Sequence, residues 1–326
     1  MLNSATAFRQ GIYKSELVRR ITRWLDATPH PPLALEITPE RVAAARFGRT
    51  GALDGYAVET LPQGAIVPSA VESNIGNAGA VKLAVSNACA RLKAKDEDIA
   101  LILPDPVIRV FVQHFDEFPR SAQEAEPMLR WKLKKSVPFE VDETLISFMR
   151  QSPREDGVDI VTALSRLRIV REYESLAEAQ ELRPGVVLSS SLAAITLLDD
   201  QKPTLLARVS ANSLTTAIVR EGVLCGYRCT ELPAQGLDLT PQMLLEEIYP
   251  VAAYYQDTWR EGVQAVTLTG LGSRLPEFVP PFEEEFHCEI TSLLNSAVAG
   301  GRVHDDVRPL AERELEGLVG WAMHRG

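Results

Sequence analysis

The 326-residue sequence contains only four cysteines, and their spacing gives no metal-binding pattern. Cys225 and Cys229 are separated by three residues within a strand-like apolar run, whereas Cys89 and Cys288 are far away along the chain. Structural zinc sites use closely spaced pairs of thiolate or imidazole ligands. We therefore interpret the cysteines as structural or incidental thiols, and we expect no bound metal.

Histidine is also scarce, and the sequence lacks the short motifs of several enzyme classes. None of the five histidines has a His-x-x-x-His partner. The chain contains neither the Gly-x-Ser-x-Gly nucleophile turn nor the Gly-x₄-Gly-Lys-Ser/Thr phosphate loop. These absences argue against a zinc hydrolase, a serine hydrolase of that class and a P-loop NTPase.

The sequence has no excess of basic residues and no long apolar run. Its formal net charge of -10 argues against nucleic acid as a partner, because binding to phosphates requires a concentrated basic surface. No run of about 18 apolar residues occurs, and the N-terminus has no signal-peptide core. We expect a cytoplasmic protein.

Residues 1–30 show the pattern of a basic amphipathic helix. One helical face would carry Leu17, Val18, Ile21, Trp24 and Leu25. Five basic residues against two acidic ones give this segment a local charge of +3. Such a helix can rest on anionic lipid, or it can pack its apolar side on the protein itself or on a partner. Prolines 29, 31 and 32 then end the segment as a stiff linker.

Two parts of the chain repeat the same order of predicted elements. The first has strands at 33–37, 41–47 and 56–60, a helix at 78–92 and a strand at 99–103. The second has strands at 205–209, 213–219 and 223–227, a helix at 240–259 and a strand at 265–269. Each part predicts an antiparallel meander followed by a helix and a further strand. The repetition indicates a duplicated ββαβ-type α/β unit with a cleft between its copies.

A segment of different character separates the two copies. It reads as a strand at 107–114, a helix at 121–135, strands at 144–151 and 158–163, and a closing helix at 169–180. Ser121 followed by Glu124 is typical of a capping box at a helix start. We interpret residues 105–180 as an inserted α+β subdomain.

Several local motifs follow one another along the chain: Phe118-Pro119, Val137-Pro-Phe139, Ser191-Leu-Ala-Ala-Ile-Thr196, Leu268-Thr-Gly-Leu-Gly-Ser273 and Gly317-Leu-Val-Gly-Trp-Ala322. Together, in this order and spacing, they resemble the PilM family. PilM proteins are FtsA-related, actin-like cytoplasmic proteins of the type IV pilus assembly platform. The resemblance covers roughly residues 33 to 325.

The resemblance implies an actin-like ATPase (RNase H-like) fold with an FtsA/PilM-type insertion. The first actin-like unit would comprise 31–104 and 181–200, completed by a C-terminal helix at 308–325. The second would comprise 201–239 and 262–307, with a small helical subdomain at 240–261 and the insertion at 105–180.

The resemblance also implies where a nucleotide would bind, and the sequence departs from the family there. In actin-like ATPases two hairpin turns carrying Asp-x-Gly hold the phosphates and Mg²⁺, and a glycine turn holds the adenosine. The corresponding residues are Glu36 and Thr38, Arg208 and Ser210, and Gly270, Gly272 and Ser273.

Two of these substitutions disfavour phosphoryl transfer. Thr38 places a Cβ where glycine lets the turn close on a phosphate. Arg208 cannot help to ligate Mg²⁺, which requires oxygen ligands. We therefore expect a vestigial nucleotide site, no cofactor and no ATPase activity.

The residues of this site also allow simpler interpretations. Glu36 can be a solvated turn carboxylate, or it can pair with Arg208 across the cleft and hold the two units closed. Gly270 and Gly272 can form a plain strand-to-helix turn instead of a vestigial adenosine site.

The family's partner is the short cytosolic N-terminal tail of the bitopic protein PilN, bound between the first unit and the insertion. By position, the groove would involve Val107, Arg109, Phe111, Leu129, Leu133, Val137 and Phe139. These apolar positions can equally be core.

The resemblance thus implies a scaffold on the cytoplasmic side of the inner membrane that contacts PilN-like and other platform components or further copies of itself. Residues 1–30 would add a peripheral membrane contact. Two alternatives remain: an active actin-like ATP-binding protein, and the cytoplasmic domain of a GspL-like type II secretion protein.

Overall fold

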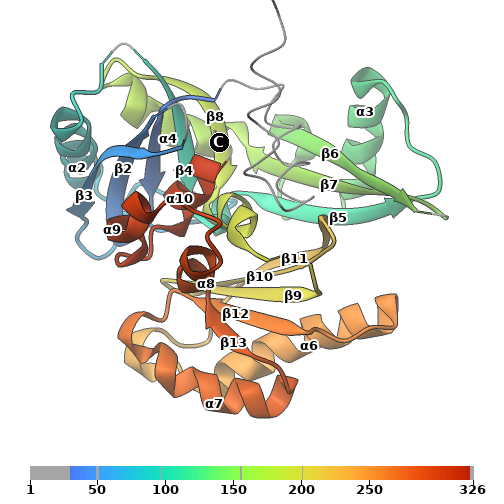
Figure 1. Ribbon diagram of the computed structural model, residues 1–326. Coiled ribbons are helices and arrows are strands. Elements are labelled where there is room, and N and C mark those ends of the chain that lie inside the picture. Colours follow the sequence, from blue (N-terminus) through green and yellow to red (C-terminus); the bar gives the residue numbers. More distant parts are fainter. Residues whose placement is uncertain (1–29, 49–50, 96, 155, 200, 324–326) are drawn as a thin grey trace, which may run out of the picture.

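The computed structural model describes residues 30–323 except 49–50, 96, 155 and 200. These residues form two five-stranded sheets and one three-stranded sheet (Figure 1). The helix expected within residues 1–30 lies outside the described part of the chain. Among the described helices, none has both the length and the apolar character needed to span a bilayer.

The first five-stranded sheet begins with the predicted antiparallel meander. Its strands are β1 (Leu33–Ile37), β2 (Arg41–Phe47), β3 (Leu53–Thr60), β4 (Asp98–Leu103) and β8 (Arg183–Ser189), in the spatial order β3-β2-β1-β4-β8. β4 and β8 join parallel to β1. Helix α2 (Ala78–Arg91) packs on β2 and β3. Strand β3 begins three residues before the predicted start at Tyr56.

The second sheet repeats this topology. Its strands are β9 (Thr204–Ser210), β10 (Ser213–Arg220), β11 (Val223–Glu231), β12 (Ala265–Thr269) and β13 (Ile290–Ser292), in the order β11-β10-β9-β12-β13. The first three are again antiparallel and the last two parallel. The predicted duplication is confirmed, and β12 has the predicted bounds.

Two helices outside the predicted sheets contribute to the cores of those sheets. Helix α4 (Leu167–Glu178), which the sequence assigns to the insertion, buries Ile169 and Tyr173 in the core of the first sheet. Helix α6 (Pro241–Trp259), which the sequence assigns to a small helical subdomain, buries Leu244 and Ile248 in the core of the second sheet. An amphipathic pattern indicates that a helix has an apolar face, but not which sheet covers it.

The insertion is a three-stranded sheet covered by one helix. Its strands β5 (Arg109–Phe115), β6 (Thr144–Arg154) and β7 (Gly157–Arg166) lie in the order β5-β7-β6. Helix α3 (Ala122–Leu133) follows the expected cap at Ser121, whose hydroxyl accepts a hydrogen bond from the backbone N–H of Gln123. Figure 1 shows α3 on the outer side of this sheet. The opposite face packs on both units, since Val110 and Val161 belong to a core cluster that contains residues of the first sheet and also Ala217 and Leu224 of the second.

A buried glutamine joins the insertion to the second unit. The Gln151 side chain on β6 donates from Nε2 to the carbonyl oxygen of Leu224 on β11 at 2.8 Å. Its Oε1 accepts from the Leu224 N–H at 2.7 Å. The amide therefore satisfies both backbone groups of a residue on an edge strand, much as a neighbouring strand would.

The last part of the chain leads from the second unit back to the first. It passes from α7 (Leu275–Phe286) through β13, α8 (Leu293–Ala299), the 3-10 turn η7 (Asp305–Val307) and α9 (Arg308–Ala311) to α10 (Glu316–Met323). Helix α10 packs on α5 (Ser190–Ala194) and on β1. Its Trp321 is fully buried and donates from Nε1 to the Pro31 carbonyl oxygen at 3.2 Å.

Close approach of α10 to α5 depends on Gly320. A Cβ at this position would lie 2.1 Å from the Ala193 carbonyl oxygen, a backbone atom that cannot rotate away. We predict that Gly320→Ala lowers the free energy of unfolding by about 1–3 kcal/mol, measured by urea denaturation. Gly262→Ala is the control, because a Cβ there meets no atom within 4 Å. Equal stabilities of the two variants would contradict this packing argument.

Candidate functional site

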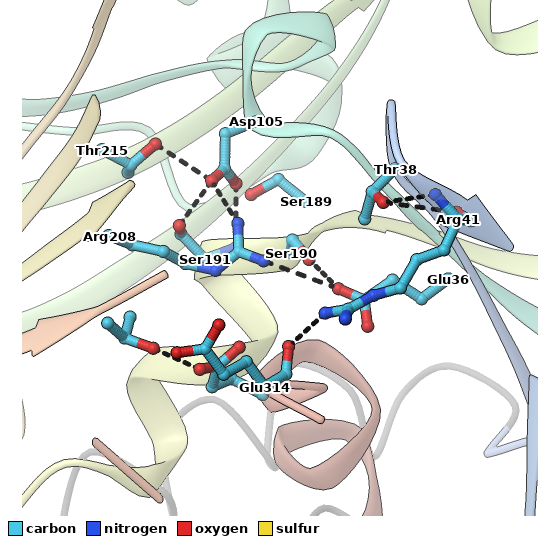
Figure 2. Close-up of polar contacts among 12 residues, drawn as sticks. Glu36, Thr38, Arg41, Asp105, Ser189, Ser190, Ser191, Arg208, Thr215 and Glu314 are labelled. Atoms are coloured by element: carbon cyan, nitrogen blue, oxygen red, sulfur yellow. Dashed lines mark hydrogen bonds and ion pairs between the residues drawn. The ribbon is translucent and has the colours of Figure 1, made fainter. Parts of the chain in front are cut away.

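Arg208 lies near the end of β9 and is buried between the two units, with 5% of its surface exposed. Its Nη1 lies 3.3 Å from Asp105 Oδ2, and its Nη2 lies 3.8 Å from Glu36 Oε1 (Figure 2). The predicted pairing of Arg208 with Glu36 across the cleft is confirmed. The alternative of a solvated Glu36 is wrong, because this residue on β1 is only 1% exposed.

Asp105 is the nearer partner of Arg208, and the sequence analysis missed it. Its Oδ1 accepts from the Ser191 N–H at 2.8 Å, and its Oδ2 accepts from the Ser191 and Thr215 hydroxyls at 2.5 and 2.9 Å. Tyr227 donates to Oδ1 at 3.4 Å. Ser191 belongs to the first unit, whereas Thr215 and Tyr227 belong to the second. One carboxylate thus binds groups from both units.

The C-terminal segment completes the site with two further carboxylates. Glu316 of α10 is buried and accepts a hydrogen bond from the Thr269 hydroxyl at the end of β12. The Glu314 carboxylate accepts from the Gly272 N–H at 2.9 Å, and its backbone carbonyl accepts from Arg41 Nη2 at 2.5 Å. This segment therefore connects the first hairpin with the glycine turn.

The predicted turn residues have clear structural roles. Gly270 has φ of +79°, and a Cβ there would lie 1.8 Å from the Val209 carbonyl oxygen, so only glycine fits. Thr38 closes its own hairpin, because its hydroxyl accepts from the Arg41 N–H at 3.2 Å. Gly272 begins the 3-10 turn η6 (Gly272–Arg274), which leads into α7.

Two of the predicted site residues lie beside the network and are not part of it. The Ser210 carbonyl accepts from the Ser213 hydroxyl at 2.9 Å, which closes the turn between β9 and β10. Ser273 lies exposed in η6. The hydrogen bonds of Arg41 and Glu314 therefore connect Thr38 with the glycine turn, and an ion pair joins Glu36 to Arg208, whereas the two serines join neither set.

The charges of this network are unequal, with one fully buried cation among three buried carboxylates, Glu36, Asp105 and Glu316. Burial lowers the pKa of Arg208, but the attraction of Asp105, Glu316 and Glu36 outweighs it and keeps this pKa above its usual value. Burial raises the pKa of Glu36, opposed by Arg208 and by the hydrogen bond from Ser190. Its Oε2 is buried without a hydrogen-bond partner. Among described residues, no group of three or more His, Cys, Asp and Glu side chains could hold a metal.

The predicted partner-groove residues fall into three groups. Phe111, Val137 and Phe139 are half-buried around the fully buried Leu133, between β5 and the end of α3. Leu129 is buried in a neighbouring cluster under α3, and Val107 is buried in the core of the first unit. A partner could therefore reach Phe111, Val137 and Phe139, together with the half-buried Arg109, without repacking the core.

Three polar atoms around Phe111 are buried without a hydrogen-bond partner. They are Arg109 Nε, Gln113 Oε1 and Thr162 Oγ1. Arg109 and Gln113 lie two residues before and after Phe111 on β5, so their side chains share its face of the sheet. Thr162 is the residue directly opposite Phe111 on β7. Sequence patterns cannot reveal such atoms, because whether a polar group is satisfied depends on its neighbours in space.

Comparison with known proteins places this geometry in a known fold. No protein-family model and no curated protein matches the sequence. The PilM-PilN type IV pilus biogenesis complex contains a chain with a TM-score of 0.68 and 16% identity, matching 91% of this chain and 99% of that one. The chain has the fold of PilM. The predicted actin-like fold and the resemblance to PilM are therefore confirmed at the level of structure.

Two further structures are more distant. A Bacteroides thetaiotaomicron protein described as having an actin-like ATPase fold and unknown function gives a TM-score of 0.46 at 9% identity, covering 84% of this chain and 98% of its own. The cytoplasmic domain of EpsL, an inner-membrane component of the Vibrio cholerae type II secretion system, gives 0.45 at 11% identity, covering 73% and 82%.

Within this PilM fold, we predict that Arg208 is essential to stability. Arg208→Met leaves three buried carboxylates without their cation and should lower the free energy of unfolding by about 3–5 kcal/mol at neutral pH. Burial already makes Glu36 easier to protonate in the folded protein than in the unfolded chain, and removing Arg208 raises the pKa of Glu36 further. The loss should therefore shrink as the pH falls toward the ordinary glutamate pKa and grow as the pH rises.

The matched control is Arg220→Met on the neighbouring strand. Arg220 pairs with Glu261 at 3.3 Å, and its side chain is 30% exposed, so its removal should cost no more than about 1 kcal/mol. Urea denaturation of both variants at two pH values measures the difference. A loss for Arg208→Met that is as small as the control, or independent of pH, would contradict the role assigned to this guanidinium.

Proposed function

We propose that this chain is a non-enzymatic scaffold of the PilM type in a type IV pilus assembly platform. It binds the short cytosolic tail of a PilN-like bitopic protein at the cytoplasmic side of the inner membrane. The fold supports this proposal, since the PilM of the matched structure is in a complex named for PilM and PilN. Platform proteins of this kind act through binding surfaces, so the question is which surface binds the tail.

The three unpartnered polar atoms around Phe111 carry the proposal. A buried polar group without a hydrogen bond costs about 1–3 kcal/mol, and folded proteins satisfy most of them. Here a donor on Arg109, an acceptor on Gln113 and a hydroxyl on Thr162 surround one half-buried aromatic ring. An extended peptide offers backbone N–H and C=O groups at short intervals and apolar side chains between them. A tail packed on Phe111 would bring both kinds of contact next to the half-buried Arg109 and Gln113, whereas Thr162 is 0% exposed and is enclosed by the protein itself.

The network between the units supports a scaffold that needs no nucleotide. Glu314 already binds the Gly272 N–H, and Ser191, Thr215 and Arg208 already bind the oxygens of Asp105. Several buried acids would also repel a triphosphate. In this proposal the Arg208 network holds the two units together without a bound nucleotide.

For the tail site, we predict that Phe111→Asp weakens binding of a synthetic PilN-like tail at least about tenfold, measured by fluorescence anisotropy. Leu145→Asp is the control, because Leu145 is 47% exposed on the other edge strand, β6, of the same sheet. Both variants must retain the wild-type circular dichroism spectrum. Equal losses in the two variants would exclude a site at Phe111.

A second variant separates binding from folding. Gln113→Leu removes an unsatisfied acceptor, so it should leave the stability of the free protein unchanged or slightly raised while weakening the tail complex. A structural role alone would lower stability and leave the affinity of the folded fraction intact. Thermal unfolding and anisotropy on the same sample distinguish these results.

For nucleotide, we predict that millimolar ATP with Mg²⁺ does not change the melting temperature. A ligand at about 100 times its dissociation constant would add about 2.7 kcal/mol and raise the melting temperature by several degrees. Glu314→Ala is an informative companion, since it frees the Gly272 N–H. A Mg²⁺-dependent shift in the wild type would instead support the active ATP-binding alternative.

A further inference from the structure

The C-terminal end of α3 carries an exposed tryptophan beside two lysines. Trp131 is 79% exposed, which is unusual for the largest apolar side chain. Lys134 and Lys135 follow in the exposed turn after the helix, and neither forms an ion pair with any residue the structure describes. Although the protein has a net charge of -10, Lys134 and Lys135 make the surface beside Trp131 basic. We name Trp131, Lys134 and Lys135 the α3 patch.

The neighbouring cations are already bound within the subdomain and do not belong to the patch. Arg130 pairs with Glu126 at 2.8 Å and donates to the Thr144 carbonyl oxygen at 3.0 Å. Lys132 donates to the His114 carbonyl oxygen at 3.1 Å, and its amine lies 3.7 Å from the centre of the Phe115 ring. Two lysines are therefore left for an external ligand.

The three side chains of the patch lie close together in the sequence at the end of α3 and are all exposed. Trp131 belongs to the last turn of the helix, and Lys134 and Lys135 are the first two residues after it. Leu129 and Leu133 of the same helix are fully buried, so the exposed Trp131 lies on the solvent side of α3. Residues 127–139 contain four basic residues and no acidic one.

We propose that the α3 patch contacts an anionic phospholipid surface. Tryptophan favours the boundary between water and acyl chains, and each lysine near an anionic leaflet strengthens binding about fivefold. A stable protein interface requires about 800 Å² on each partner, far more than three side chains on one helix end provide. A bilayer needs only a protruding patch of this kind.

The α3 patch lies close in sequence to residues of the proposed tail site. Leu133, two residues from Trp131, packs in the same cluster as Phe111, Val137 and Phe139. A tail bound there is continuous with a transmembrane helix, which would keep this end of α3 close to the bilayer. This geometric argument rests on the proposed function, whereas the chemistry of the patch does not.

Vesicle co-sedimentation of the full chain tests the proposal. We expect binding to phosphatidylcholine vesicles containing about one-third phosphatidylglycerol at millimolar lipid, little binding to pure phosphatidylcholine, and weakening as salt is raised. The triple variant Trp131→Ala/Lys134→Glu/Lys135→Glu should bind anionic vesicles at least about tenfold more weakly.

The matched control makes the same changes of charge and apolar surface elsewhere. Leu83→Ala/Lys82→Glu/Lys93→Glu alters three exposed residues on and just after α2 and should bind as the wild type does. Equal binding by the triple variant and this control, or no binding by the wild type, would overturn the proposal. The first result would assign lipid contact to another part of the chain, such as residues 1–29.

Tail binding in the absence of lipid keeps the two proposals separate. The triple variant should bind a synthetic PilN-like tail as tightly as the wild type does, because the three patch residues are exposed and do not belong to the cluster that contains Phe111. Failure of the vesicle test with normal tail binding overturns only the lipid contact. Normal lipid binding without any tail binding overturns only the proposed partner.

Discussion

The burial of a single guanidinium determines how the parts of this molecule fit together. Moving a charge out of water costs several kcal/mol unless fixed partners replace its hydration. Arg208 obtains those partners from separate segments: Glu36 on β1, Asp105 after β4 and Glu316 on α10. Each segment must therefore be in place before the charge is compensated. The interaction adds little net stability, but it requires both units and the C-terminal helix to assemble in one arrangement.

The duplicated topology explains why these groups meet. β1 and β9 occupy equivalent central positions, each between an antiparallel neighbour and a parallel one. Glu36 and Arg208 lie near the ends of these two strands, and the facing sheets bring the ends together. Helix α10 can enter the same space because residue 317 is glycine, where a Cβ would lie 2.4 Å from Glu36 Oε1. The site thus depends on small residues as much as on charged ones.

Sequence patterns predicted most strands of the two meanders and the insertion, because alternating apolar runs, turn residues and caps act locally, but they did not predict β8, β13 or α7. β12 and the start of α3 after Ser121 are examples. Charge reversal at Arg208 also pointed to Glu36. Asp105 was missed because it lies between two prolines, in a context typical of an exposed turn. Glu316 was missed because its apolar neighbours indicate only a buried helix. Local sequence patterns do not indicate which residues from distant parts of the chain are buried against one another.

The insertion is held by contacts with both actin-like units, but its sheet face toward α3 contains polar atoms without hydrogen-bond partners. Val110 and Val161 pack into the first core, and Gln151 binds the second unit through both backbone groups of Leu224. The face toward α3 nevertheless retains unpartnered polar atoms around Phe111. Valine in place of Thr162 would fill about the same volume without a hydroxyl, so the Thr162 hydroxyl makes no hydrogen bond that stabilises the described fold. A rigidly held sheet with hydrogen-bonding capacity left on one face is what an extended peptide ligand requires, because the ordering cost then falls on the peptide alone.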